Sequence, residues 1–420
     1  MAAGFAVNVL LTRLLTPAEV GAYFLIYSLV AAASAVAMLG LNFSIVRLVA
    51  ESLSLDQPGR AKGAILLTFA IVFSAIFLLD AALITIPSTW LAGHIFVEGG
   101  RPLVWLTAAW IAVFTLQLIS AEVFRGMHDI RSASVFGGLV IAVLGALFFL
   151  VCLVVGVHLT LPYAVALSVV AGAANFVFAG WLIRGKVKTL NAIPRFHFRE
   201  MLLISAPLWI ANLTLLVLTQ ADVWILSTAR SHDAVAVYGA AVRMTTFMTV
   251  PLLVINSTLL PVISELYARG DRKALERTLR GTAALGVIPA ALVLAFFCIF
   301  GSGLMGVAFG SFYSGGFYVL LILSVGQLVN IAGGSCAYVL MMTGHQREMM
   351  WITLIAGIGT VVLGFALVSS YGALGVATGS ALGLMFQTIA MWLCTRLRLG
   401  IWTHCSMANL WRLLLTFKRT

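Results

Sequence analysis

Apolar stretches of about 20 residues or more, the length that crosses a bilayer, follow one another along this chain with only short polar breaks. The chain of 420 residues is 62% hydrophobic and 9% charged, which no soluble core requires. Inside hydrocarbon each backbone amide must bond within its own segment, and these stretches are too long and too uniformly apolar for barrel strands. The sequence therefore predicts an all-α integral membrane protein and excludes soluble enzyme folds.

Hydropathy windows of about 19 residues, divided at Gly, Pro and charged residues, predict about twelve transmembrane helices. They lie near 2–16, 20–47, 63–87, 103–124, 133–156, 161–183, 201–228, 235–264, 281–304, 317–343, 348–370 and 373–395. The first is short, so we expect it either to be tilted and capped by a neighbour or to begin upstream. Because no basic residue precedes its apolar run, we interpret it as a helix rather than a cleaved signal.

The basic residues are distributed unevenly between the two sides of the predicted membrane. Of the 25 Lys and Arg residues, all but Arg13, Arg101, Arg230 and Arg243 fall in segments that face the cytoplasm if the N-terminus does. This asymmetry follows the positive-inside rule and predicts that both termini are cytoplasmic, N-in and C-in. The net charge of +11 is thereby explained without nucleic acid.

The two halves of the chain resemble each other weakly but in order. Residues 18–29 align with 233–244, which pairs Val20 with Val235 and Tyr23 with Tyr238. Since each half has an even number of spans, the halves share one orientation, which is typical of a V-shaped, alternating-access transporter. The predicted organisation is an N-terminal six-helix lobe at 1–184, a cytoplasmic linker at 185–200, a C-terminal six-helix lobe at 201–396 and a basic cytoplasmic tail at 397–420.

Asp222 and Arg243 are charges within two consecutive apolar spans. Counted from the outside turn at Ser231, they lie about 13 and 18 Å deep, so the two helices can bring them together. Charges at that depth normally face the bundle interior or a wet cavity. One interpretation is an ion pair that only joins the helices. The other is an anion contact by Arg243, oriented by Asp222, because guanidinium stays charged and binds phosphate through two parallel hydrogen bonds.

Three further charges are candidate site residues. Arg13 either lines a cavity or extends to the outer interface from the short first helix. Arg47 ends the second span on the inside, where it acts as a topology charge or guards the inner mouth. Asp80 is isolated among apolar residues; it is a coupling-ion candidate, as Asp222 is, unless a neighbouring helix supplies a partner.

Soluble cofactor chemistry has no signature in this sequence. The His and Cys residues show no metal-ligand spacing, and the GxxxxGK[ST] phosphate loop is absent. We therefore expect no metal, no cofactor and no enzymatic activity, and transport driven by gradients, membrane potential or substrate supply.

An ordered set of segments resembles the bacterial polysaccharide flippases, which export O-antigen and exopolysaccharide repeat units and share a superfamily with the multidrug and toxic compound extrusion antiporters. The segments are RLLTPAEVGAYF from Arg13, SAPLWIANLTLLVLTQADVWIL from Ser205, VAVYGAAVRM from Val235, LLPVISELYARGD from Leu259 and LMMTGHQREMM from Leu340. The resemblance implies a polyprenyl-diphosphate-linked oligosaccharide as substrate, moved from the cytoplasmic to the periplasmic leaflet. It also implies that Asp222, Arg243, Arg13 and Arg47 are substrate-binding.

The resemblance implies the inner membrane of a bacterium as location, membrane lipid and the lipid-linked glycan as partners, and glycan polymerase and chain-length machinery as further candidates. A cation-coupled drug or metabolite antiporter using Asp80 and Asp222 is an alternative, although the first helix lacks the acid that many such antiporters carry. A membrane glycan polymerase or ligase, or a non-transporting scaffold, is an alternative of another class. A polymerase would need a large charged outside loop, and the outside loops here are short and nearly uncharged.

Overall fold

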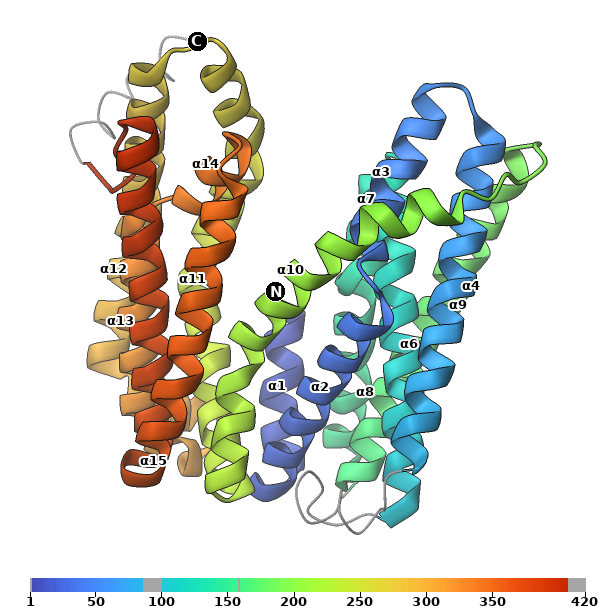
Figure 1. Ribbon diagram of the computed structural model, residues 1–420. Coiled ribbons are helices and arrows are strands. Elements are labelled where there is room, and N and C mark those ends of the chain that lie inside the picture. The colour runs from blue at the N-terminus through green and yellow to red at the C-terminus, as the bar shows by residue number, and fades with distance from the viewer. Residues whose placement is uncertain (1, 86–99, 158, 407–420) are drawn as a thin grey trace. The chain divides into compact units, whose positions relative to one another are not determined.

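The computed structural model describes residues 2–85, 100–157 and 159–406, and all regular elements in these ranges are helices (Figure 1). The all-α membrane fold is thus confirmed. Nine of the described helices are long and apolar enough to cross a bilayer. The count of twelve spans and the N-in, C-in orientation stay predictions.

The chain forms two compact units. Unit 1 is Met1–Gln220 with Ser231–Ala236, and unit 2 is Ala221–Arg230 with Val237–Thr420. The division falls inside the helix α10 (Phe198–Ala229) and near the start of the next helix, whereas the predicted boundary lies in the 185–200 loop. The grouping of helices into two lobes of six stays a prediction. Each unit is described separately below.

Unit 1 is built around one central helix. α6 (Gly100–Gly126) packs against α2, α3, α4 and α9 and also contacts the short elements that follow it, α7 and η1. The helices of the unit are α1 (Ala2–Leu14), α2 (Pro17–Ala37), α3 (Leu41–Ser54), α4 (Pro58–Thr85), α6, α7 (Ile130–Ser134), the π-helical turn η1 (Val135–Leu139), α8 (Val140–Val155), α9 (Leu161–Thr189) and the larger part of α10 (Phe198–Ala229).

The start of α2 is specified by its sequence. Thr16 and Glu19 form a capping box in which each side chain accepts a hydrogen bond from the other's backbone N–H, and Pro17 occupies the first helical position. Glu19 also accepts a hydrogen bond from the backbone N–H of Leu161, 3.1 Å away, at the start of α9. One carboxylate therefore caps two helices at the same end of the unit.

The predicted span 20–47 is interrupted. Leu39 and Gly40 have φ of +48° and +75°, and α3 begins only at Leu41. A Cβ atom at Gly40 would lie 2.3 Å from the carbonyl oxygen of Ser205 in α10, so only glycine allows this approach. The Ser205 hydroxyl is in turn 2.7 Å from that of Ser44.

Unit 2 contains the longest helices. The helices of this unit are the end of α10, the larger part of α11 (His232–Ala268), α12 (Arg272–Phe309), the 3-10 turn η2 (Ser311–Gly316), α13 (Phe317–Gly333), α14 (Cys336–Met342) and α15 (Gln346–Leu399). α15 is broken at Gly372, φ +56°, which lies between the predicted spans 348–370 and 373–395. Arg230 donates hydrogen bonds to the carbonyl oxygens of Val368 and Ser369, 3.3 and 2.9 Å away, just before this break.

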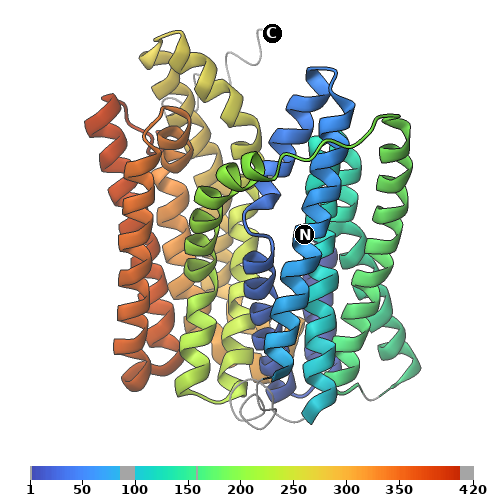
Figure 2. The same ribbon diagram turned by 45° about the vertical axis from the view of Figure 1, so that its right-hand side comes forward.

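The linker and the tail are both attached to helices. α9 ends at Thr189, and the following extended segment runs over the start of α4 (Figure 2). There the backbone N–H of Arg195 bonds to the carbonyl of Gly59 at 2.8 Å. At the other end of the chain, Thr403 and Cys405 donate to carbonyl oxygens at the end of α13. Residues 407–420 of the predicted tail lie outside the described residues.

Candidate functional site

A carboxylate and a tyrosine hydroxyl together link three helical segments of unit 2. Asp222, near the end of α10, accepts a 2.8 Å hydrogen bond from the hydroxyl of Tyr238 in α11 and another of 2.8 Å from the backbone N–H of Val223. Tyr238 is fully buried, and its hydroxyl is also within hydrogen-bonding reach of Ser380 in the second half of α15. The acid therefore has a neutral donor built into the packed interior.

Arg243 lies on the same helix as Tyr238, five residues further on, and is partly buried. It is close enough to Asp222 to act on the carboxylate electrostatically. The structure thus brings together the two charges that the sequence singles out. Sequence reasoning missed Tyr238 as the hydroxyl that holds Asp222. We call Asp222, Tyr238, Arg243 and Ser380 the Asp222 cluster.

Unit 1 holds a counterpart of the tyrosine without the acid. Tyr23 in α2, which aligns with Tyr238, is buried, and its hydroxyl lies 2.8 Å from that of Ser168 in α9. The first helix of this unit, α1, contains no Asp or Glu. The buried tyrosine of unit 1 thus contacts a serine, whereas that of unit 2 contacts the carboxylate of Asp222. The alignment of the two tyrosines was the signal that could have identified Tyr238.

The two arginines of the opening segment are both exposed. Arg13 lies in the last turn of α1. Arg47 was predicted to end a helix; this is wrong, because α3 continues to Ser54, and Arg47 lies in its middle. Its side chain is 69% exposed and 3.9 Å from the carboxylate of Glu51, so it is a surface group with a weak ion pair.

Asp80 lies in α4, close to the end at Thr85. Its Oδ1 atom is buried, and among the described residues it has no hydrogen-bond partner. Residues 86–99, which follow α4, lie outside the described residues, so both interpretations of Asp80 stay predictions. In the described ranges no three His, Cys, Asp or Glu side chains gather as metal ligands would.

An acid outside the spans fixes one of the basic residues of α9. Asp129 caps α7 through the backbone N–H of Ser132, 3.0 Å away, and accepts a 2.6 Å hydrogen bond from Lys186. The hydrogen bond from Lys186, followed by that from Ser132, lowers the pKa of Asp129 from 3.8 to about 2. Lys186 is therefore neutralised by a carboxylate that stays ionised at any physiological pH.

The sequence of residues 1–267 matches the family described as "Polysaccharide biosynthesis protein". The matched part is more than half of the chain, and it includes Arg13, Arg47, Asp80, Asp222 and Arg243. The chain belongs to this polysaccharide biosynthesis family. One relative of this chain is the "Probable low-salt glycan biosynthesis flippase Agl15" of Haloferax volcanii. The two sequences are 24% identical over 399 residues, which cover 90% of this chain and 76% of the relative.

Solved transporter structures share the fold of this family member. An inward-facing multidrug resistance MATE family transporter of the MOP superfamily has a TM-score of 0.75 at 16% identity, covering 95% of this chain and 94% of its own. A MOP superfamily transporter from Pyrococcus furiosus, whose reversed pocket polarity suggests a different function for it, has a TM-score of 0.63 at 16% identity, covering 95% and 92%. The predicted transporter fold is thereby confirmed, and family and fold together support a membrane transporter.

Proposed function

We propose that this protein flips a polyprenyl-diphosphate-linked oligosaccharide from the cytoplasmic to the outer leaflet for surface polysaccharide synthesis. The observation that carries the proposal is membership of a polysaccharide biosynthesis family in a chain that has a transporter fold. The similarity to a protein described as a probable glycan biosynthesis flippase supports it.

The Asp222 cluster supplies chemistry that suits a diphosphate. Arg243 offers a permanent positive charge and a planar set of donors that binds phosphate oxygens in pairs. In this proposal Asp222 orients Arg243, and Asp222 is itself held by the hydroxyl of Tyr238. Because unit 1 packs its equivalent tyrosine without an acid, we assign the acid to substrate handling rather than to folding.

Alternating access completes the mechanism that we propose. The headgroup enters from the cytoplasmic side, the polyprenyl tail stays in lipid, and rocking of one lobe against the other exposes the headgroup outside. Arg13 and Arg47 are secondary candidates for substrate contacts, and both are exposed. We propose the bacterial cytoplasmic membrane as the location, and the machinery that polymerises the glycan and sets its chain length as partners.

The test is to deplete the protein in its host and to measure which leaflet holds the polyprenyl-diphosphate oligosaccharide. A membrane-impermeant glycan-modifying enzyme added from outside reports on the outer leaflet. We expect the lipid-linked glycan to accumulate where this enzyme cannot reach it. Complementation with Arg243→Ala should leave the accumulation in place although the variant inserts normally, whereas Arg269→Ala, which removes an exposed surface ion pair, should restore export.

Two results would contradict the proposal. Accumulated glycan that is accessible from outside would indicate a later step, such as polymerisation. Full export with Arg243→Ala would exclude the assigned anion contact while leaving flipping itself intact, so the site and the function are tested separately.

A cation-coupled antiporter is the second candidate, favoured by the likeness to multidrug transporters and by the buried, unpartnered oxygen of Asp80 among the described residues. It predicts that Asp80→Asn abolishes proton-coupled efflux of cationic compounds. Vesicles energised by a pH gradient, with a fluorescent cation as substrate, provide the measurement. If wild-type vesicles show no efflux above empty vesicles, this candidate is excluded.

A further inference from the structure

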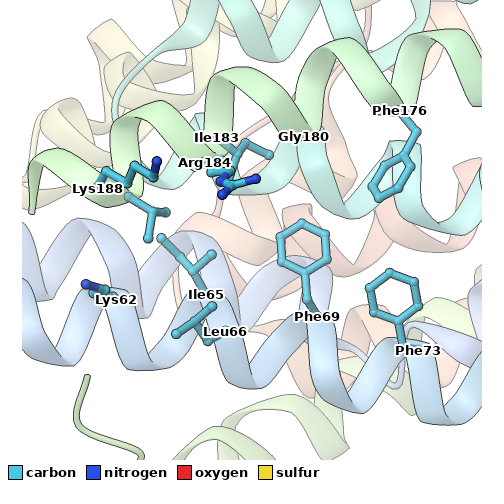
Figure 3. Close-up of a pocket in the computed structure, with 11 residues that line it drawn as sticks. Lys62, Ile65, Leu66, Phe69, Phe73, Phe176, Gly180, Ile183, Arg184 and Lys188 are labelled. Atoms are coloured by element: carbon cyan, nitrogen blue, oxygen red, sulfur yellow. The ribbon is translucent and has the colours of Figure 1, made fainter. Parts of the chain in front are cut away.

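A groove runs along the surface of unit 1 between α4 and α9, and it has a charged end and an apolar end. Both helices pack on α6, which leaves the space between them open, with a volume of about 470 Å³. Figure 3 shows the basic side chains at one end and three phenylalanines at the other. The residues that carry this polarity are Lys62, Phe69 and Phe73 of α4 and Phe176, Arg184 and Lys188 of α9.

The basic end of the groove has no acidic counterpart. Arg184 and Lys188 are four residues apart and so lie on one face of α9. Neither they nor Lys62 forms an ion pair with a described residue, and no Asp or Glu lines the groove. Lys186, by contrast, is bound to Asp129. The positive-inside rule explains why basic residues occur at this end of the helices. It does not explain why three of them line one groove in which none of the described lining residues is acidic.

The length of the groove matches one leaflet of a bilayer. Lys62 and Phe73 are eleven residues apart, which is about 16 Å along a helix, or about half of a hydrocarbon core about 30 Å thick. The floor consists of Ile65 and Ile183, which are buried, and the walls include Leu66 and Phe73, which are 42% and 49% exposed. A phospholipid has the same polarity along its length, with the charged phosphate at the membrane surface and the apolar acyl chain toward the membrane centre.

From this geometry we propose that the groove binds an anionic phospholipid of the cytoplasmic leaflet. The headgroup phosphate contacts Lys62, Arg184 and Lys188, and one acyl chain lies along Phe69, Phe73 and Phe176. Basic clusters between transmembrane helices on the cytoplasmic side recognise anionic headgroups, and three cations surrounded by apolar surface fit that chemistry. The inference does not depend on the proposed flipping activity.

The test compares lipid binding to the purified full-length protein by native mass spectrometry, with phosphatidylglycerol and phosphatidylcholine of identical acyl chains. We expect phosphatidylglycerol to bind about tenfold or more tightly, because each basic side chain near a membrane surface contributes roughly fivefold. The triple variant Lys62→Gln, Arg184→Gln, Lys188→Gln should lose this preference. A control triple variant on exposed basic residues of unit 2, Arg269→Gln, Lys273→Gln, Arg277→Gln, should keep it.

A second variant tests the apolar end without touching the charges. Gly180 lines the groove, and an added Cβ there would contact nothing within 4 Å, so Gly180→Trp can fill the groove while the fold is kept. We expect it to weaken binding of both lipids by about tenfold, the cost of excluding one buried acyl segment.

Four results would overturn the proposal: equal binding of the two lipids to the wild type, a preference that survives the basic triple variant, normal binding by Gly180→Trp, or competition by inorganic phosphate as effective as that by lipid. Displacement of phosphatidylglycerol by a polyprenyl diphosphate at lower concentration would also overturn it, because the groove would then belong to the transported substrate. Retention of phosphatidylglycerol in the presence of that polyprenyl lipid would support it.

Discussion

Tyr238 and Tyr23 are aligned residues whose hydroxyl groups have different partners. Both tyrosines are buried and contact a serine on another helix of their own unit, and Tyr238 also donates to the carboxylate of Asp222. Composition and hydropathy revealed Asp222 because a charge stands out in an apolar span. They did not reveal Tyr238, because a tyrosine in such a span is unremarkable and its partner is set by packing between helices.

Tyr238→Phe should therefore impair both stability and transport. Removing the hydroxyl leaves one oxygen of Asp222 without its donor, which should destabilise the protein by about 1–3 kcal/mol. Thermal unfolding of the purified variant and the leaflet assay of lipid-linked glycan measure the two effects. Tyr23→Phe is the matched control, for which we expect a smaller loss of stability and normal transport. Equal transport by both variants would show that the donor to Asp222 has no functional role.

At the scale of the element, the end of α13 is closed by the chain that follows α15. The hydroxyl of Thr403 and the backbone N–H of Cys405 satisfy the carbonyl groups of Gly333 and Ala332, and Trp402 packs beneath the guanidinium of Arg396 at 4.7 Å. We call residues 400–406 the strap. The predicted basic tail thus begins with a segment that packs against helices. Its basic composition predicted a cytoplasmic tail but did not predict this packing.

His404 makes the strap sensitive to pH. Its ring nitrogens face two donors, Trp392 at 3.2 Å and Arg280 at 3.1 Å, so a neutral ring can accept from one of them whereas a charged ring can accept from neither. Burial, and then the charge of Arg280, lower the pKa of His404 below 6.5, although Glu276 opposes this. The strap is therefore fully stable above pH 6.5 and loses stability as the pH falls through the lowered pKa.

Hydrogen exchange of residues 400–406, followed by mass spectrometry, measures this effect. Between pH 7.5 and 5.5, after correction for the intrinsic exchange rate, we expect protection of the strap to fall in the wild type. With His404→Gln the fall should be absent. His197→Gln, which changes an exposed histidine of the 190–197 segment, should behave as the wild type does. Protection that is independent of pH in the wild type would contradict the assignment.

At the scale of the whole molecule, apolar length predicted where helices lie but not where they are interrupted. The start of α9 and the boundary near Gly372 followed from Pro, Gly and charge placement, whereas α2 begins at Pro17, three residues before the predicted start. The break at Leu39–Gly40 was not predicted, because a hydropathy average over a window does not reveal a single glycine. Glycine is required at position 40 only because α10 packs closely against it. The class of function was predicted from a set of sequence segments that resemble a known family in the same order. The groove between α4 and α9 could not be predicted from the sequence, because it results from the packing of both helices on α6.

The contact of the 190–197 segment with α4 constrains how this protein can evolve. The segment approaches through its backbone: a Cβ at Gly59 would lie 2.5 Å from the carbonyl oxygen of Ile193, and one at Gly63 would lie 1.9 Å from that of Arg195. Ile193 itself is 86% exposed, so its side chain takes little part in the contact. Substitutions at Ile193 should therefore be tolerated far more readily than any replacement of Gly59 or Gly63, because a side chain at either glycine would overlap the backbone of the segment.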